Sequence, residues 1–274
     1  MKKFLGVVIV LYCSVVFSCE SLEEGTDGMQ EDGQTENTTA GQDNASAAAN
    51  TPATANRNSP LVLNQYRRND SSDPDWDIAA LDTAKDINYL SSIEKSVILE
   101  LNKVRADPRK YARLYIRPEL QYYSGKFYRR PGQGRILTYE GIKAVEDCIT
   151  ALTNMESAPP LMPELGLSLG ARDLAYEQER TGETGHEGSD NSTPFTRIRR
   201  YGGAYTAAAE NLYYGAEQAR EVVIQLLIDD GMSSRTQRAN IMNRNFSQVG
   251  VSFGSHPQYK SVCVIMFADG YLSN

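Results

Sequence analysis

The chain has no apolar run long enough to cross a bilayer, no zinc-finger spacing, no Walker loop and no heptad repeat. A membrane-spanning helix needs about 20 apolar residues, whereas the run from Phe4 to Phe17 is shorter. Aromatic residues are missing altogether from Glu20 to Pro60, where Arg57 is the one basic residue among eight acidic ones. These absences argue against a threaded membrane protein, a P-loop enzyme and a coiled coil, and they divide the chain into unlike segments.

The N-terminal segment has the composition of a secretory leader. Lys2 and Lys3 precede the apolar run, and Val16-Phe17-Ser18-Cys19 closes it with a small residue and a cysteine. This run resembles the lipobox, which implies that a signal peptide of residues 1–18 is removed and that Cys19 becomes the acylated N-terminus. We therefore expect a cell-envelope lipoprotein, carrying acyl chains such as palmitate, with the outer-membrane surface as one candidate location. An ordinary secretory signal cleaved near Ser18 and an uncleaved anchor are the alternatives.

Residues 19–85 are predicted to form a disordered acidic tether. The part from residue 20 to 60 carries a net charge of −7 and is dominated by Thr, Asn, Ala, Gly and Gln. Such a composition cannot bury enough apolar surface to offset the entropy of ordering the chain. Residues 61–274 have a net charge of only −2. A near-neutral body argues against nucleic acid as a partner, because phosphate binding needs a basic surface.

Residues 86–274 are enough for one domain with its own core. Ser91 and Glu94 form a capping box at the start of a helix, and Asp107-Pro108 is typical of the start of a second one. Alternation over 249–253 followed by an apolar run over 262–267 predicts a hairpin with a buried second strand. Helices followed by a strand pair indicate an α+β domain. Apolar residues at helical spacing predict further helices over about 142–152, 169–180, 194–201 and 217–228.

Six blocks of this domain resemble the signature blocks of the CAP superfamily, the cysteine-rich secretory proteins, antigen 5 and pathogenesis-related proteins, in its bacterial SCP-like branch. The resemblance covers nearly the whole domain and implies an α-β-α sandwich with a central antiparallel sheet between helical layers. The blocks are Gly185-His186-Glu187-Gly188-Ser189-Asp190-Asn191-Ser192, Arg200-Tyr201-Gly202, Ala209-Glu210-Asn211-Leu212, Leu227-Ile228-Asp229-Asp230-Gly231, Arg238-Ala239-Asn240-Ile241 and Val249-Gly250-Val251.

The resemblance also implies a cavity lined by two histidines and two acidic residues, which in some members hold a divalent metal. Matched block by block, these positions fall on His186, Glu210, Asp229 and Gln237, so one histidine is replaced by glutamine. An amide oxygen is a weak zinc ligand. We therefore expect no firmly bound cofactor and at most a weakly held divalent metal at His186 and Glu210. Structural roles are open for each residue: ordering a loop, capping backbone N–H groups, or a solvated charge at a helix end.

Two functional classes follow from the resemblance. The first is a non-catalytic surface module, held to the membrane by its N-terminal lipid, that binds a lipid, sterol, glycan or host protein. The second is a metal-dependent hydrolase or peptidase that uses His186, Glu210 and Asp229. Gln237 favours the binding module, so we assign no catalytic residue. A triad of His186 with Ser189 and its neighbour Asp190 is a weak alternative, because triads are recognised by geometry and not by proximity in sequence.

The two cysteines of the domain lie on predicted apolar stripes. Cys148 falls in a helix and Cys263 in a strand. A free buried cysteine packs as a small hydrophobic residue, and this is the interpretation we favour. A disulfide between them is the alternative, since an extracytoplasmic location permits one.

Overall fold

The structure, a computed structural model, describes residues 14–18 and 76–274. The predicted acylation site Cys19, the predicted tether up to residue 75 and most of the predicted signal peptide lie outside these residues. No helix in the described part is both long and apolar enough to cross a membrane. The described residues 14–18 and Asp77–Asn274 belong to one compact unit, whose main part starts before residue 86, the predicted start of the domain.

The helices begin where the sequence places its capping residues. At the start of the second helix the Ser91 backbone N–H donates to Oε2 of Glu94 (2.7 Å), and the Ser91 hydroxyl accepts from the Glu94 backbone N–H. Asp107 caps the next helix by accepting from the Lys110 N–H at 2.8 Å. Both predicted helix starts are confirmed. The helices are α1 (Ile78–Leu81), α2 (Ser92–Ala106), α3 (Pro108–Tyr111), the π-helical turn η2 (Ala112–Ile116), the 3-10 helix η3 (Arg117–Tyr122), α4 (Ile142–Asn154), α5 (Leu165–Thr181), α6 (Pro194–Arg199), α7 (Ala219–Ile228) and α8 (Thr236–Met242).

One mainly antiparallel sheet forms the centre of the domain. Its strand order is β1-β7-β9-β8-β5, and β5 alone pairs in parallel, with β8. The predicted C-terminal hairpin is confirmed as β8 and β9, which pair from Gln248↔Ala268 to His256↔Lys260. Two small sheets accompany it, β2-β3-β4 and β6-β10. The strands are β1 (Ser14–Ser18), β2 (Tyr123–Ser124), β3 (Phe127–Tyr128), β4 (Ile136–Leu137), β5 (Met162–Pro163), β6 (Gly202–Gly203), β7 (Ala207–Tyr214), β8 (Gln248–His256), β9 (Lys260–Ala268) and β10 (Leu272–Ser273).

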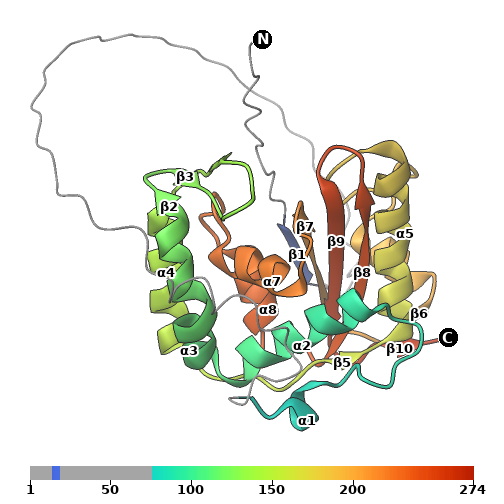
Figure 1. The fold of residues 1–274 in the computed structure, drawn as a ribbon. Coiled ribbons are helices and arrows are strands. Elements are labelled where there is room, and N and C mark those ends of the chain that lie inside the picture. The colour runs from blue at the N-terminus through green and yellow to red at the C-terminus, as the bar shows by residue number, and fades with distance from the viewer. Residues whose placement is uncertain (1–13, 19–75) are drawn as a thin grey trace, which may run out of the picture. The chain divides into compact units, whose positions relative to one another are not determined.

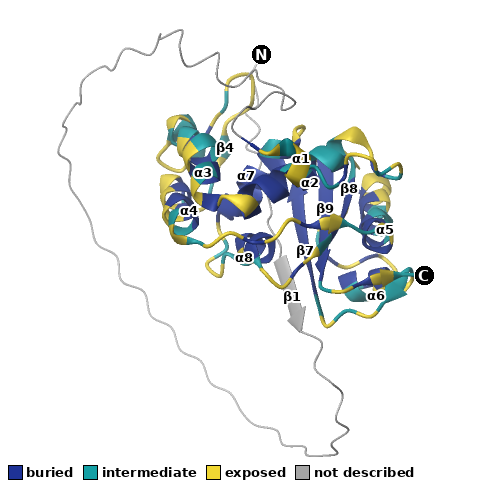
Figure 2. Ribbon diagram, turned by 90° about the horizontal axis from the view of Figure 1, so that it is seen from below, coloured by how far each residue is buried: buried dark blue, intermediate teal, exposed yellow. Residues whose placement is uncertain are grey.

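Helices cover both faces of the central sheet. Helix α5 packs along β8 and β9 on one face, while α2, α7 and α8 lie on the other (Figure 1). On the α5 side a single apolar cluster joins Leu174 and Ala171 to Leu212, Val264 and Met266. The strands and the inner faces of the helices are buried on both sides (Figure 2). This arrangement confirms the expected α-β-α sandwich.

Strand β7 and the β2–β4 meander are among the elements that were not predicted. Strand β7 contains the run Ala207-Ala208-Ala209-Glu210, which has low β propensity, and nearly every position of the strand is buried. A strand buried on both faces has no polar alternation to reveal it. No element was predicted for residues 123–137, which form the β2–β4 meander.

Both cysteines of the domain are free and buried, as predicted. Burial raises the pKa of the Cys148 thiol to about 12 and that of the Cys263 thiol further. Because the thiolate is the reactive form, neither cysteine is poised to act as a nucleophile at neutral pH.

Candidate functional site

His186 and Glu210, two of the four predicted cavity residues, lie side by side. His186 belongs to the loop between α5 and α6, and its Nδ1 is 2.7 Å from Oε1 of Glu210 on β7. Two hydrogen bonds order this loop. The Gln178 amide donates to the Gly185 carbonyl at 2.7 Å, and the Gly185 N–H donates to the Tyr214 hydroxyl at 3.0 Å. The loop therefore presents the histidine ring to a strand buried in the sheet.

Arg197 is a third member of this group that the sequence analysis missed. Its guanidinium donates to Oε2 of Glu210 at 2.7 Å, and to the carbonyls of His186 and Ser192 at 2.8 and 2.9 Å. His186, Glu210 and Arg197 are each no more than 6% exposed. The short helix α6, which opens with Thr193 as its cap, places the arginine there. No spacing rule connects positions 186, 197 and 210, because a loop, a helix and a strand bring them together.

A divalent metal does not fit this group. Both carboxylate oxygens of Glu210 are engaged, one by His186 and one by Arg197. A cation placed there would have to displace the guanidinium and sit beside its positive charge. Within residues 14–18 and 76–274, no three His, Cys, Asp or Glu side chains gather closely enough to hold a metal ion. His186, Glu210 and Arg197 instead form a buried hydrogen-bonded network around one carboxylate.

Asp229 and Gln237, the other two predicted cavity residues, form a second group. Asp229 ends α7 in the left-handed conformation (φ 52°). Its Oδ2 accepts from the Gln237 backbone N–H at 2.9 Å, and its Oδ1 accepts from the Gln237 side-chain amide at 3.2 Å. Burial raises the pKa of the Asp229 carboxyl, although these hydrogen bonds oppose the shift. The Gln237 Oε1 is buried and has no hydrogen-bond partner among the described groups.

Asn211 links this second group to strand β7. Its side chain donates to the Gln237 carbonyl at 3.0 Å and accepts from the Asn240 amide at 2.8 Å. Glu210 and Asn211 are consecutive in a strand, so their side chains point to opposite faces of the sheet. The structure therefore joins His186 to Glu210 on one face, and Asp229 to Gln237 on the other.

Ser189 and Asp190 do not assemble a triad with His186. The Ser189 backbone N–H donates to a Glu177 carboxylate, and Asp190 accepts from the Ser192 N–H at 2.9 Å and from Arg200 at 2.6 Å. The histidine Nδ1 faces Glu210 instead. The Ser189 backbone and the Asp190 carboxylate therefore stabilise the turn.

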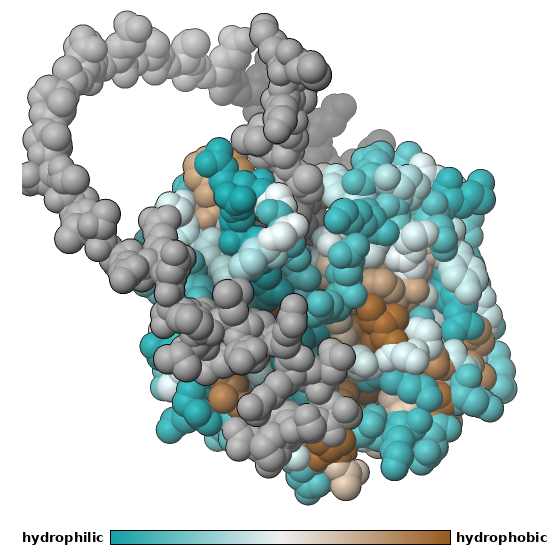
Figure 3. Space-filling view, in the orientation of Figure 1, coloured by the Kyte–Doolittle hydropathy of each residue, from teal (hydrophilic) through white to brown (hydrophobic). Residues whose placement is uncertain are grey.

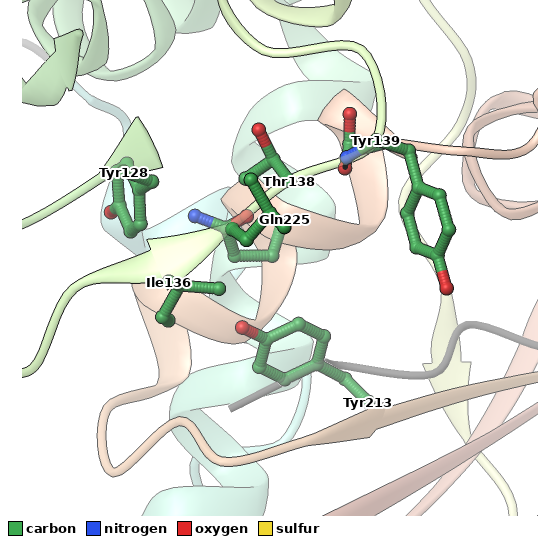
Figure 4. A pocket seen from close by; sticks show the side chains of 8 residues that line it. Tyr128, Ile136, Thr138, Tyr139, Tyr213 and Gln225 are labelled. Atoms are coloured by element: carbon green, nitrogen blue, oxygen red, sulfur yellow. Dashed lines mark hydrogen bonds between the residues drawn. The ribbon is translucent and has the colours of Figure 1, made fainter. Parts of the chain in front are cut away.

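A pocket that the sequence analysis did not predict lies between the β2–β4 meander and α7 (Figure 4). It is shallow: its volume of about 350 Å³ includes open solvent, and a water-sized sphere can enter only about 20 Å³ of it. Asp230 forms one wall and accepts from the backbone N–H groups of Tyr139 and Glu140 at 2.7 and 2.8 Å. The Tyr213 ring points from β7 toward Ile136 on β4 (Figure 4). The lining residues are Tyr128, Ile136, Leu137, Thr138, Tyr139, Tyr213, Gln225 and Asp230.

Comparison with known proteins identifies the family. Protein YkwD of Bacillus subtilis (strain 168) is 29% identical over 116 residues, which are 41% of this chain and 43% of that protein. The chain therefore matches less than half of this relative. An outer surface protein of Borrelia burgdorferi superposes with a TM-score of 0.35 and 20% identity, over 40% of this chain and 77% of that one. An extracellular SCP-domain protein of Bacillus anthracis gives 0.34 and 17%, over 47% and 38%. The cysteine-rich secretory protein family, CAP, matches residues 100–267, more than half of the chain. The chain belongs to the CAP family.

Proposed function

We propose that this chain is an extracytoplasmic lipoprotein whose CAP domain binds a ligand and catalyses no reaction. The observation that carries the proposal is that both carboxylate oxygens of Glu210 are engaged inside the protein, one by His186 and one by Arg197. A general base needs an acceptor within hydrogen-bond reach of the substrate proton. Glu210 is 0% exposed and offers none.

The second polar group supports the same conclusion. The Asp229 carboxylate is occupied by the backbone and side-chain amides of Gln237, and the backbone of Arg238 adds a longer contact at 3.4 Å. A hydrolase would need these acids close to an open site with a metal or a nucleophile. The shallow pocket beside the β2–β4 meander is lined by tyrosines and a few polar groups, a lining that suits contact with a ligand more than hydrolysis.

Catalysis is tested with the purified domain. We expect no hydrolysis of peptide or ester substrates above background, with or without added zinc. Zinc-dependent hydrolysis that Glu210→Gln abolishes would replace the binding module with a hydrolase. Arg180→Gln changes an exposed position on α5 and is the matched control, because it shows how much activity any variant loses during preparation.

The membrane anchor is tested at Cys19. The protein should incorporate radioactive palmitate when expressed with its leader, and Cys19→Ala should leave an unlabelled, longer precursor. Cys13→Ala is the matched control and should label normally, because Tyr12 before it is not a small residue. Labelling that persists in Cys19→Ala would contradict the lipoprotein assignment.

A further inference from the structure

One segment of the domain differs in charge from all the rest. From Arg109 to Lys143 the chain has nine basic residues and two acidic ones, a net charge of +7. The domain from Asp77 to Asn274 has a net charge of only −1, so the remainder of it carries −8. The segment runs from α3 through the β2–β4 meander to the start of α4. A positive field of this kind favours an anionic partner.

Three cations of the meander and one at the start of α4 have no acidic partner among the described residues. Lys126, Arg129, Arg135 and Lys143 are exposed, and none of them forms an ion pair with a residue of the described chain. Arg130 is different, since it bonds Glu119 at 2.6 Å and is half-buried. One arginine of the meander therefore stabilises the fold through an ion pair, while four other cations of this region are exposed to solvent.

Exposed apolar side chains lie among these cations. Leu137 is 41% exposed and Ile142 37% exposed. Leu137 pairs with Phe127 across the meander, and the Arg135 guanidinium lies 4.1 Å from the centre of the Phe127 ring. These contacts place a cation and two apolar side chains on one face.

Arg129 follows β3 two residues after Phe127 and so lies on the same side, and backbone contacts bring Lys126 and Lys143 close by. The Thr138 N–H donates to the Lys126 carbonyl at 2.8 Å. A Cβ on Gly141 would lie 2.4 Å from the Gly125 carbonyl oxygen, so the chain leading into Ile142 and Lys143 passes directly against the turn that holds Lys126. Figure 3 shows hydrophilic and hydrophobic side chains adjoining over this region, in the upper left of the view.

We propose that this surface, formed by Lys126, Arg129, Arg135, Leu137, Ile142 and Lys143 and called here the meander surface, docks on membranes that contain anionic lipid. The cations meet the headgroup phosphates, and Leu137 and Ile142 enter the interface. Exposed aliphatic side chains favour a lipid surface over a polyanion such as nucleic acid or an acidic glycan, which offers no apolar layer. The inference rests on the proposed function and names lipid as the ligand class of the binding module.

The test uses the unacylated chain of residues 20–274, which lacks the apolar leader that would bind membranes by itself. The proposed signal cleavage and this truncation both remove the edge strand β1, which among the described strands pairs only with β7. Its sedimentation is measured with vesicles of phosphatidylcholine alone and with vesicles that also contain phosphatidylglycerol. We expect binding only to the anionic vesicles. Raising the salt from 0.1 M to 1 M should release the protein, since the screening length falls from about 10 Å to about 3 Å. The double variant R129Q/R135Q should weaken partitioning by about thirtyfold.

The matched control is R180Q/R199Q, which removes two exposed arginines from α5 and α6 and should partition as the wild type does. Leu137→Ser should weaken binding and leave its salt dependence in place. Equal binding to neutral vesicles, no binding to anionic vesicles, or an equal loss in R180Q/R199Q would each overturn the proposal. Stronger binding to DNA or heparin than to anionic vesicles would also overturn it. Because Cys19 is absent from this protein, none of these results depends on whether the anchor is acylated.

Discussion

The two polar groups on either face of strand β7 each contain a buried carboxylate, and they stabilise it in different ways. On the α5 face, Glu210 is balanced by a full positive charge from Arg197 at 2.7 Å. On the opposite face, Asp229 is held by amides, and the Gln237 side chain contributes one bond of 3.2 Å. The first group contains a buried ion pair. The second is a carboxylate stabilised by neutral donors.

The difference predicts that a substitution in the first group destabilises the protein more than one in the second. Removing one partner of a buried ion pair leaves an uncompensated charge, which costs several kcal/mol. Removing one neutral donor to a buried carboxylate costs less, about 1.5–3 kcal/mol, because it leaves the other donors in place. The glutamine at position 237 thus lies in the group that loses less stability on substitution.

The largest effect is expected for Arg197→Leu. The change leaves the Glu210 carboxylate with His186 alone, and it removes the donors to the carbonyls of His186 and Ser192. We expect the free energy of unfolding to fall by about 3–5 kcal/mol. Urea denaturation followed by circular dichroism measures it.

Arg200→Gln is the matched control for that experiment. Arg200 also contacts two carboxylates, Asp173 and Asp190, but its side chain is 41% exposed. An exposed pair contributes about 0–1 kcal/mol, so the control should lose little. Equal losses in Arg197→Leu and Arg200→Gln would show that burial does not distinguish the two arginines, and the comparison between the groups would fail.

The layered fold was predictable because its signals are local. The capping box at Ser91, the Asp107-Pro108 helix start and the alternation before Phe253 each report the backbone conformation within a few residues. Strand β7 was missed because its Ala-rich sequence is buried on both faces and carries no period. Tertiary packing alone makes it a strand.

The site was only partly predictable. Family resemblance located His186 and Glu210, which the structure places in contact. It could not show that Arg197 would lie against the same carboxylate, because that contact depends on how α6 docks. Nor could it show that Asp229 and Gln237 would meet on the other face of the strand, since the direction of a side chain follows from the register of β7.

A smaller effect is expected from Gln237→His, measured by isothermal titration with zinc. The new imidazole would lie beside Asp229, which offers one carboxylate, and zinc sites need three or four ligands. We expect wild-type affinity no tighter than micromolar and a gain of less than tenfold in the variant. His186→Ala should leave both values unchanged. Tight stoichiometric zinc that His186→Ala abolishes would mean that the two groups form one metal centre.

The smallest effect is expected from Asp229→Asn, and its sign depends on pH. Burial raises the pKa of Asp229 above its ordinary value of 3.8, so the folded state holds the proton more tightly than the unfolded chain does. The ionised carboxylate therefore costs stability at pH values above its folded pKa, and this cost disappears as the pH falls from that pKa toward 3.8. Asparagine carries no charge to bury.

Asparagine also suits the site in two other respects. It accepts the left-handed backbone at position 229 (φ 52°) readily, and its amide can donate to the Gln237 Oε1 if that side chain turns over. We expect Asp229→Asn to unfold at a slightly higher urea concentration at pH 7, by up to about 1 kcal/mol, with the difference shrinking toward pH 4. Asp190→Asn is the control and should change stability in the opposite direction, because hydrogen bonds from Ser192 lower the pKa of Asp190 to about 2. The ionised Asp190 therefore stabilises the fold at pH 7, and this stabilisation is lost as the pH falls from 3.8 toward 2. A loss of stability in Asp229→Asn at pH 7 would show that the hydrogen bonds from Gln237 outweigh the cost of burial, and that an ionised carboxylate stabilises the protein on both faces of β7.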